Sequence, residues 1–342
     1  MRALFVNAIN YTVDVETRYP NLGLGYLISA LRRHFGEKAF DLKVIDRDVT
    51  KILKGFKPHI VCITSVSQNY HIAKRIAACA KAAHIPVIVG GIHVSLLPCS
   101  LGEGMDAGCI GEGESTVVEL FSLFMKKGVF LKEDLASVKG IVYRDKDQRV
   151  LVNPRREHVF NLDEIAPAAR DLLKINSHTY MFTSRGCPYN CVFCASANYW
   201  GKVRFFSAEY VVREIEELVE KYGVKIITFF DDLFIADIPR VRRIAQLLEE
   251  KPFFRKVRFT CSARANLVNE EAAQLLKRMR IFSVALGIES GSEKTLKYLK
   301  GPNISIEDNS RAISILNKYK ISPNAAFVIG APQETREDMR KT

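Results

Sequence analysis

Long hydrophobic runs are missing from this chain of 342 residues, which limits where the protein can act. No apolar stretch approaches the roughly 20 residues that a membrane-spanning helix needs. The N-terminal stretch MRALFVNAIN also lacks the apolar core and the small-residue cleavage site of a signal peptide. The sequence therefore predicts a cytoplasmic protein with no membrane span.

Concentrated basic tracts are missing as well. The chain has 50 Lys and Arg residues against 38 Asp and Glu residues, so its formal net charge is +12. These basic residues are spread along the chain and do not alternate with aromatic residues in any one segment. A solvated basic surface, which also suits an anionic cofactor, explains this distribution better than a nucleic-acid interface does. We therefore expect no nucleic-acid partner.

Disulfide bonds are not expected, although eight cysteines are present. In a cytoplasmic chain of this size, cysteines are thiols or metal ligands before they are disulfides. Four of them lie in apolar or small-residue surroundings, which predicts buried structural thiols: Cys62, Cys79, Cys99 and Cys109. The surroundings of Cys261 favour no single interpretation, and the other three cysteines lie close together in the sequence.

What the sequence does contain is an alternation of β-branched apolar runs with amphipathic segments, which predicts a parallel α/β architecture of about two domains. The first part carries five expected strands, at residues 2–8, 41–48, 59–66, 85–91 and 107–114. Helical signals accompany them at residues 24–35, 71–84, 98–101 and 115–128. This pattern predicts a doubly wound, Rossmann-like sheet of flavodoxin-like size over residues 1–138.

A domain boundary is expected at residues 139–175, which have the pattern of a hairpin followed by a linker with several prolines. The alternation then resumes over residues 176–342. Its expected strands are at residues 178–186, 224–232, 256–264, 282–290 and 322–332. Each is followed by a helical or helix-starting stretch, so five βα units are visible, and no sixth strand follows.

The cysteine cluster has the spacing C-x3-C-x2-C and consists of Cys187, Cys191 and Cys194. A structural zinc site needs four donors, and the nearest candidates, His178 and Cys261, are not at zinc-finger spacing. Thiolates also hold iron–sulfur clusters, and three of them leave one iron open to bind a substrate or cosubstrate. We therefore favour an iron–sulfur cluster with chemical function over three structural cysteines in a turn.

This motif, at the end of the first strand of a βα array, resembles the radical S-adenosylmethionine (SAM) superfamily. The resemblance extends to Phe193 and to four segments, at residues 229–234, 260–267, 285–301 and 327–335. It implies a partial (β/α)6 radical SAM barrel, in which a four-iron four-sulfur cluster holds SAM and its reductive cleavage gives a 5′-deoxyadenosyl radical. The absent sixth unit suggests a fragment of a longer chain.

The resemblance also implies which residues contact SAM: Phe193, Asp231, Asp232, Ser262, Arg264, Glu289 and Ser290. Adjacent residues of a strand point to opposite faces, so a helix cap explains at most one of Asp231 and Asp232. We expect one of this pair, together with Glu289 or Ser262, to contact SAM, because carboxylates suit its ammonium and ribose groups.

The N-terminal half resembles the cobalamin-binding domain that precedes many radical SAM cores. The resemblance rests on four segments, at residues 20–32, 63–70, 88–98 and 109–114. A doubly wound sheet binds flat cofactors at the carboxyl ends of its strands, where glycine lets the backbone approach the ligand. The expected cobalamin contacts are Ser65, Ser67, Gly90, Gly91, Glu112 and Gly113.

The motif D-x-H-x-x-G, which supplies a histidine to cobalt in methionine-synthase-type modules, does not occur in the sequence. We therefore expect His71 and His93 to be surface or packing residues. Cobalamin would then bind with its dimethylbenzimidazole tail on and without a protein histidine on cobalt.

Together the two resemblances imply a cobalamin-dependent radical SAM methyltransferase. It would act on an unactivated carbon or phosphorus centre through the 5′-deoxyadenosyl radical and methylcobalamin, with both halves facing one cavity. Its expected partners are a small-molecule or natural-product substrate and an electron donor such as flavodoxin or ferredoxin.

Three alternatives remain open at this point. A cobalamin-dependent radical SAM cyclase or rearrangement enzyme would differ from a methyltransferase in the mass of its product. A methylthiotransferase would need a second three-cysteine cluster, for which the N-terminal cysteines are poorly spaced. A non-catalytic cobalamin or iron–sulfur sensor would leave the segments FFDDLF and GIESGS without a role.

Overall fold

The computed structural model describes residues 1–342, with the exception of the side chain of Val15. The chain forms two compact units, each of which is described by itself. The first unit comprises residues 1–160 and 164–174, and the second comprises residues 161–163 and 175–342. No helix of the described residues is both long and apolar enough to cross a membrane.

The first unit is built on one seven-stranded sheet with the order β2-β1-β3-β4-β5-β6-β7. Strands β1 to β5 pair in parallel, and β6 and β7 are antiparallel. The strands are β1 (Arg2–Asn7), β2 (Asp41–Ile45), β3 (Ile60–Thr64), β4 (Val87–Gly90), β5 (Ala107–Cys109), β6 (Ile141–Arg144) and β7 (Val150–Val152). From β1 the chain adds β2 on one side, and it then adds β3, β4 and β5 on the other side. The point between β1 and β3 is therefore a topological switch point, and doubly wound sheets bind ligands in the crevice at such a point.

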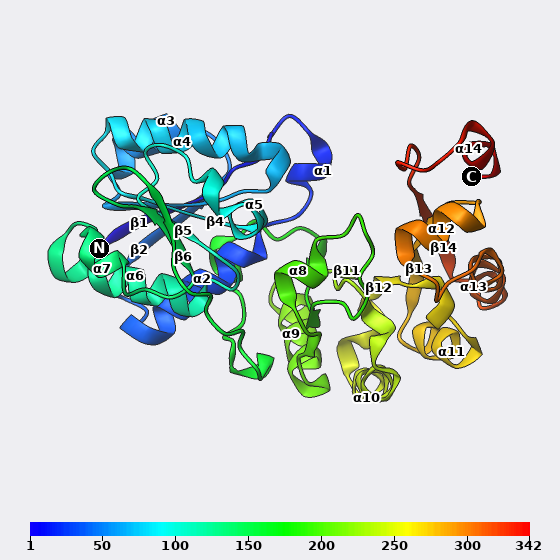
Figure 1. Cartoon of the computed structure of the whole chain (residues 1–342). Helices are drawn as coiled ribbons and strands as arrows, with labels where there is room; N and C mark the ends of the chain where they lie inside the picture. The colour runs from blue at the N-terminus through cyan, green and yellow to red at the C-terminus, as the bar shows by residue number, and fades with distance from the viewer. The chain divides into compact units, whose positions relative to one another are not determined.

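Helices cover both faces of this sheet, α2 and α6 on one side and α3 and α4 on the other (Figure 1). The helices are α1 (Asp14–Thr17), α2 (Leu22–Phe35), α3 (Val49–Phe56), α4 (Tyr70–Ala82), α5 (Ile92–Leu96), α6 (Glu114–Lys127) and α7 (Lys132–Leu135). Successive residues of each strand point to opposite faces, so Phe5 packs in the α2/α6 core while Leu4 and Val6 pack in the α3/α4 core. The doubly wound, Rossmann-like fold predicted from the sequence is therefore confirmed.

The structure differs from the sequence predictions at the hairpin and at one helix. The hairpin predicted ahead of the linker is present as β6 and β7, but β6 pairs with β5, so the hairpin is part of the first sheet. The reason is that β5 otherwise ends the sheet with an unpaired row of backbone groups. A short helix, α5, precedes the predicted helix start at residues 98–101, which forms only a 3-10 turn.

The buried-thiol prediction is right for two cysteines and wrong for two. Cys62 and Cys109 are buried on β3 and β5, and burial raises the pKa of both thiols, that of Cys109 to about 12. Cys79 is exposed because it lies on the solvent side of α4, whose apolar residues face the core, and Cys99 is exposed on a 3-10 turn that buries none of its residues.

The second unit is built on a five-stranded parallel sheet with the order β14-β13-β12-β11-β8. These strands are β8 (His178–Met181), β11 (Ile226–Phe229), β12 (Arg258–Ala263), β13 (Ile281–Glu289) and β14 (Ser322–Phe327), and a separate antiparallel pair is formed by β9 (Ser184–Arg185) and β10 (Arg204–Phe205). The helices are α8 (Ser196–Trp200), α9 (Ala208–Glu220), α10 (Ile238–Glu249), α11 (Glu270–Arg278), α12 (Glu293–Lys300), α13 (Ile306–Lys318) and α14 (Arg336–Lys341). Five successive βα units agree with the partial (β/α)6 barrel that was predicted.

The two faces of this second sheet differ in polarity. Figure 1 shows α9, α10, α11 and α13 along one side of the strands. Buried aromatic rings lie in this core, where Phe229 stacks on Phe234 and Phe259 at centroid distances of 4.5 and 5.1 Å. The other face carries hydroxyl groups, and Thr260 Oγ1 donates to Thr228 Oγ1 at 2.9 Å. This face therefore carries hydroxyl groups beside aromatic rings, since Tyr180 pairs with Thr228 and lies 5.1 Å from Phe230 between ring centroids.

Candidate functional site

The three-cysteine motif lies on the loop between β9 and α8. Cys187 and Cys191 are half-buried and Cys194 is exposed. The Cys194 N–H donates to the carbonyl of Cys191 at 3.0 Å, which turns the loop on itself. The Val192 N–H donates to the carbonyl of Leu299 at 3.0 Å, which fastens the loop to the end of α12. One of these hydrogen bonds lies within the loop and the other connects the loop to α12. Together they restrict the positions of the three cysteines relative to one another.

The donor set, three thiols on one loop, fits an iron–sulfur cluster. Burial raises the pKa of Cys187, and the nearby Asp232, Cys191 and Cys194 raise it further, while the Tyr189 N–H opposes the rise. No three of the described Cys, His, Asp or Glu side chains converge on one point that could hold a metal ion. A four-iron four-sulfur cluster binds each cysteine through a different iron, so its ligands surround a volume and do not converge.

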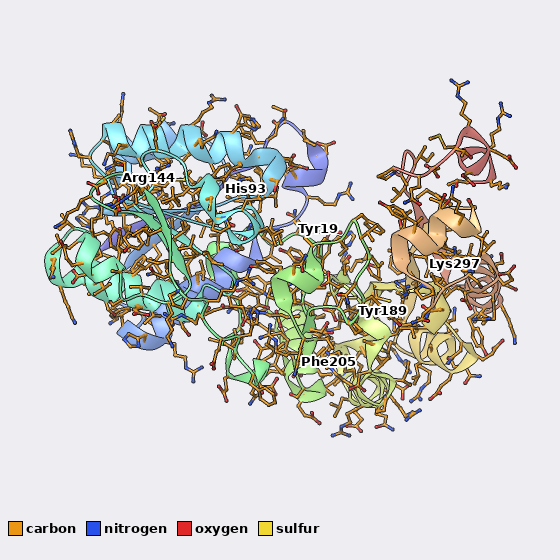
Figure 2. All side chains as sticks on the ribbon, in the orientation of Figure 1. Tyr19, His93, Arg144, Tyr189, Phe205 and Lys297 are labelled. Carbon is orange, nitrogen blue, oxygen red and sulfur yellow. The ribbon has the colours of Figure 1, made fainter. Side chains whose placement is uncertain are left out.

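Two buried cations lie beside the loop at the ends of β12 and α12. Arg264, which the sequence assigned to SAM, is 5% exposed. Its Nη1 donates to Cys191 Sγ at 3.4 Å and its Nη2 to the carbonyl of Lys300 at 2.9 Å. The guanidinium carbon also lies 4.0 Å from the ring centroid of Tyr189, which is labelled in Figure 2. Tyr189 and Lys300 lie in segments that the sequence had marked, but their contacts with Arg264 join residues 36 and 75 positions apart, which no local pattern indicates.

The adjacent acids Asp231 and Asp232 lie just beyond the end of β11, which is shorter than the predicted strand, and they have different environments. Asp231 is buried, and its Oδ1 accepts from the N–H groups of Thr183 and Ser184 at 2.6 and 3.1 Å. Burial raises its pKa, and the bonds from Thr183 and the charge of Arg240 oppose that rise. Asp232 is exposed and its Oδ2 accepts from Ser196 Oγ at 2.5 Å, at the start of α8. Asp231 thus serves the backbone that leads into the cysteine loop, whereas Asp232 remains accessible.

Glu289 ends β13 with a positive φ of 65°, a conformation that is uncommon for residues other than glycine. Its carboxylate is buried, with Oε1 3.6 Å from Nζ of Lys300. Burial raises the pKa of Glu289, which the charges of Lys300 and Arg264 oppose. Burial also lowers the pKa of Lys300. An unusual backbone conformation at a strand end is typical of functional sites.

The other predicted SAM contacts are spread around the same strand ends. Ser262 is half-buried on the polar face of β12, and Phe193 is 49% exposed between the second and third cysteines. Ser290 is buried and engaged locally: its Oγ lies 2.9 Å from Oγ1 of Thr342 and accepts from the Ser292 N–H at 3.1 Å. Ser290 therefore has a local structural role in this arrangement.

In the first unit, the loops after β3 and β4 approach each other closely at Gly91. Gly91 has φ 96° and ψ −178°, which only glycine adopts readily. A Cβ atom here would lie 2.6 Å from the carbonyl oxygen of Ser65. Ser65 is buried, and its N–H donates to the carbonyl of Gly90 at 3.2 Å. These contacts make one compact backbone surface at the carboxyl ends of β3 and β4.

The histidine of this region is engaged within its own unit. His93, labelled in Figure 2, is buried, and its Nδ1 and Nε2 lie 3.0 Å from the hydroxyls of Ser67 and Ser100, respectively. Its ring stacks on Tyr70 with a centroid distance of 3.8 Å. Burial lowers the pKa of His93, and the charge of Lys74 lowers it further. His93 is thus a packing residue in this structure, as expected, and His71 is exposed on α4.

The loop after β5 is tied to two neighbours. Glu112 accepts from the Val159 N–H at 2.9 Å, and a Cβ at Gly113 would lie 2.9 Å from Cδ2 of Leu27. Ser95, which the sequence analysis did not single out, accepts from the Gly111 N–H at 3.0 Å and donates to the carbonyl of Gly91 at 2.8 Å. One buried hydroxyl therefore joins the loops after β4 and β5, a role that alternation along the chain does not indicate.

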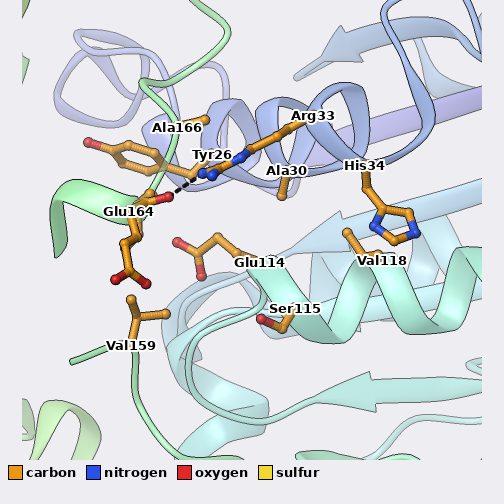
Figure 3. Close-up of a pocket in the computed structure, with 11 residues that line it drawn as sticks. Tyr26, Ala30, Arg33, His34, Glu114, Ser115, Val118, Val159, Glu164 and Ala166 are labelled. Carbon is orange, nitrogen blue, oxygen red and sulfur yellow. Dashed lines mark hydrogen bonds between the residues drawn. The ribbon is translucent and has the colours of Figure 1, made fainter. Parts of the chain in front are cut away.

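A cavity of about 440 Å³ lies between α2, the start of α6 and the chain that follows the hairpin (Figure 3). Figure 3 shows Arg33 of α2 donating to the backbone carbonyl of Glu164, at 2.5 Å. The cavity is lined by Tyr26, Ala30, Arg33, His34, Glu114, Ser115, Val118, Val159, Glu164, Ile165 and Ala166. It contains none of the six residues that were predicted to contact cobalamin.

Comparison with known proteins agrees with this division of the chain. A model of the B12 binding domain matches residues 10–121, and a model of the radical SAM superfamily matches residues 181–342. An uncharacterized methyltransferase of Pyrococcus horikoshii is 34% identical over 344 residues, which cover 96% of this chain and 73% of that protein. An anaerobic magnesium-protoporphyrin IX monomethyl ester cyclase of Rubrivivax gelatinosus is 26% identical over 365 residues, covering 100% of this chain and 65% of that protein.

The fold is also found among solved structures. The cobalamin-dependent SAM radical enzyme OxsB, solved with aqua-cobalamin and SAM bound, superimposes with a TM-score of 0.78 and 22% identity, covering 99% of this chain and 51% of that one. The present chain thus spans between half and three quarters of the length of these relatives. With a B12 binding module ahead of a three-cysteine radical SAM module, the chain belongs to the cobalamin-dependent radical SAM enzymes, whose cofactors are a four-iron four-sulfur cluster, SAM and cobalamin.

Proposed function

We propose that this chain carries the cofactor-binding units of a methyltransferase that acts on an unactivated carbon or phosphorus centre of a small molecule. The observation that carries the proposal is the cysteine loop, fastened to α12 and flanked by Arg264, at the carboxyl ends of a parallel sheet. Methyl transfer is favoured over other reactions of the family because the relative with 34% identity is named a methyltransferase.

The roles of the residues follow from their environments. When bound, the cluster supplies an electron to SAM and cobalamin supplies a methyl group. Cys187, Cys191 and Cys194 would hold the cluster. Asp232 offers an accessible carboxylate to the ammonium or ribose groups of SAM, whereas the carboxylate of Asp231 is already engaged by Thr183 and Ser184.

Glu289 and Ser262 complete the proposed SAM site from the neighbouring strand ends, and the half-exposed ring of Phe193 offers an apolar surface for the adenine. In the first unit, cobalamin would lie on the loops after β3, β4 and β5. The contacts proposed there are Ser65, Ser67, Gly90, Gly91, Glu112 and Gly113. The required electron would come from a flavodoxin or ferredoxin.

The test begins with anaerobic reconstitution of the 342-residue chain and measurement of iron and sulfide. About four irons per chain are expected for the wild type, and a marked loss is expected for Cys191→Ala. Cys79→Ala is the matched control, because this exposed cysteine lies on α4 of the other unit. A wild type without iron, or a Cys191→Ala protein with unchanged iron, would contradict the proposal.

The reaction type is tested with SAM that carries an isotopically labelled methyl group. Label should pass from SAM to protein-bound cobalamin, and reduced protein should release 5′-deoxyadenosine. The alternative is a cyclase or rearrangement enzyme, which the 26% identity to an anaerobic cyclase over the whole chain favours. A product heavier than its substrate by one labelled methyl group identifies a methyltransferase, and a product without label identifies the alternative.

A further inference from the structure

Arg264 is held by three contacts in a place where few charges are tolerated. Its side chain is 5% exposed, and its two terminal nitrogens point to Cys191 Sγ and to the carbonyl of Lys300. The Tyr189 ring lies against the guanidinium carbon at 4.0 Å. Because arginine is a planar group with donors in a fixed fork, these contacts determine its orientation. These contacts direct one donor of Arg264 toward Cys191 Sγ.

The neighbouring cation, Lys300, is compensated. Its Nζ lies 3.6 Å from Oε1 of Glu289 and donates to the carbonyl of Gly287 at 2.5 Å. The contacts of Arg264 are a sulfur, a carbonyl and an aromatic ring, and none of these is a carboxylate. Lys300 also lies close enough to interact with the charge of Cys191, but the hydrogen bond to the cysteine thiol comes from Arg264.

A cation and a hydrogen-bond donor beside a cluster thiolate have a predictable effect on electron transfer. One electron passes from the external reductant to the cluster, and the cluster gains one negative charge. Hydrogen bonds to the sulfurs and nearby charge are recognised determinants of iron–sulfur potentials. In a buried place, where the dielectric constant is low, a fixed positive charge favours the reduced form.

We propose that Arg264 is a positioning residue that raises the reduction potential of the cluster, through its hydrogen bond to Cys191 and its buried positive charge. This inference rests on the proposed assignment of the cluster to Cys187, Cys191 and Cys194. It gives Arg264 a role toward the cluster itself, where the sequence assigned it to SAM. The bond to the Lys300 carbonyl holds the guanidinium at the end of α12, where the helix dipole also favours a cation.

The experiment compares Arg264→Gln and Arg264→Lys with the wild type after anaerobic reconstitution of the full chain. Iron content is measured first, and the cluster is then titrated without SAM against redox mediators, with detection by electron paramagnetic resonance. For Arg264→Gln we expect retained iron and an equilibrium constant for reduction about tenfold lower, which lowers the midpoint by 59 mV for a one-electron couple. Arg264→Lys keeps the charge and should show a smaller shift.

The matched control is Arg258→Gln. Arg258 lies at the opposite end of the same strand, is exposed, and stacks on Phe282 with its guanidinium carbon 4.1 Å from the ring centroid. The Arg258→Gln substitution should leave both the iron content and the midpoint potential of the cluster unchanged. An Arg264→Gln protein with four irons and a wild-type midpoint would overturn the proposal, and if it also bound SAM more weakly, Arg264 would be a SAM ligand.

The remaining outcomes are also decisive. If both Arg264 variants lost the cluster while the wild type held it, Arg264 would serve only the folding of the loop, and the proposal would be wrong. If the wild type itself bound no iron, the assignment of the cluster to the three cysteines would fail first, and this inference would fail with it. The iron content of the wild type thus distinguishes the two failures.

Discussion

The buried carboxylate of Asp231 accepts the backbone N–H groups of both Thr183 and Ser184, at 2.6 and 3.1 Å. It thereby joins the end of β11 to the segment between β8 and β9, directly ahead of the cysteine loop. Arg240 donates to the carbonyl of Thr183 at 2.5 Å from the other side. The backbone that leads into the cysteine loop is therefore fixed by charged groups that the loop itself does not contain.

Replacement of Asp231 should reduce stability. Asp231→Ala leaves two buried N–H groups unsatisfied, and we expect a loss of about 3 kcal/mol in the free energy of unfolding. Asp231→Asn retains an acceptor oxygen for these N–H groups, so its free energy of unfolding should fall by less than that of Asp231→Ala. Urea titrations followed by circular dichroism measure both values, and equal losses in the two variants would contradict the hydrogen-bonding role.

Replacement of Asp232 should instead affect SAM binding. We expect Asp232→Asn to lower SAM affinity by about 1.5 to 3 kcal/mol, roughly ten- to a hundredfold, with unchanged iron content. The reason is the loss of a charge-assisted hydrogen bond at an accessible carboxylate. Equilibrium binding of SAM to reconstituted protein is the measurement. Asp237→Asn is a suitable control, because Asp237 caps α10 and asparagine caps helices equally well. Wild-type affinity in Asp232→Asn would remove Asp232 from the SAM site.

Gly91→Ala should impair cobalamin uptake more than a substitution that imposes the same backbone strain elsewhere in the first unit. The substitution forces alanine into a conformation that costs about 1 to 3 kcal/mol, and its Cβ would press on the Ser65 carbonyl. Gly36→Ala is matched in backbone strain, because Gly36 has φ 92° and ψ 150° but no atom within 4 Å of a Cβ among the described neighbours. Both proteins are titrated with cobalamin by absorption spectroscopy. Equal uptake by the two would show that the loops after β3 and β4 do not form the site.

His93 should make the first unit sensitive to acid. Burial and the charge of Lys74 lower its pKa in the folded state, so the unfolded state binds the proton at higher pH. Stability from this group is therefore present above the unfolded pKa of about 6.5 and declines as pH falls below it, by at most about 1.4 kcal/mol per pH unit. Urea midpoints between pH 7.5 and 5.5 should fall less steeply for His93→Gln than for the wild type. His71→Gln, an exposed control, should follow the wild type, and identical slopes for all three would refute the prediction.

The cobalt of bound cobalamin should carry no protein histidine. The two ring nitrogens of His93 lie at hydrogen-bonding distance from the hydroxyl groups of Ser67 and Ser100. If the His93 ring turned toward cobalt, it would lose both of these contacts. The measurement is the electron paramagnetic resonance spectrum of the cob(II)alamin form in protein labelled with ¹⁵N-histidine. Its nitrogen splitting should be the same as in unlabelled protein, whereas a change from three lines to two would place a histidine on cobalt.

The strands and principal helices could be predicted from the sequence, because buried parallel strands are continuous β-branched runs and their helices are amphipathic. The helix α3 was not predicted, although Val49, Ile52, Leu53 and Phe56 recur at helical spacing and pack on one core. Its flanking residues Asp48 and Lys57 are both left-handed, and neither end has a capping side chain. The pairing of β6 with β5 was also missed, since the edge that a hairpin joins depends on which strand lacks a neighbour.

The candidate site was predictable as far as local pattern defines it. The cysteines were found from their spacing. Asp231 and Asp232 do differ in environment, but both lie beyond the end of β11, so the alternation of a strand is not the cause. The partners of Arg264 were not predictable. The residue meets Lys300 36 positions later and Cys191 73 positions earlier, so the contact exists only once β12 and α12 have packed. Contacts of this kind depend on tertiary structure, so the periodicity of the sequence does not indicate them.

The hairpin of β6 and β7 has a consequence for how the protein behaves at high concentration. An unpaired parallel strand offers a template on which other chains can grow as intermolecular sheet. Here β5 is covered by β6, and the outermost strand on that side, β7, is only three residues long. The charged turn that precedes it includes Arg149, which pairs with Asp145 and Asp147. A short, twisted edge beside fixed charges is a poor template, so this side of the sheet is protected against self-association during synthesis and folding.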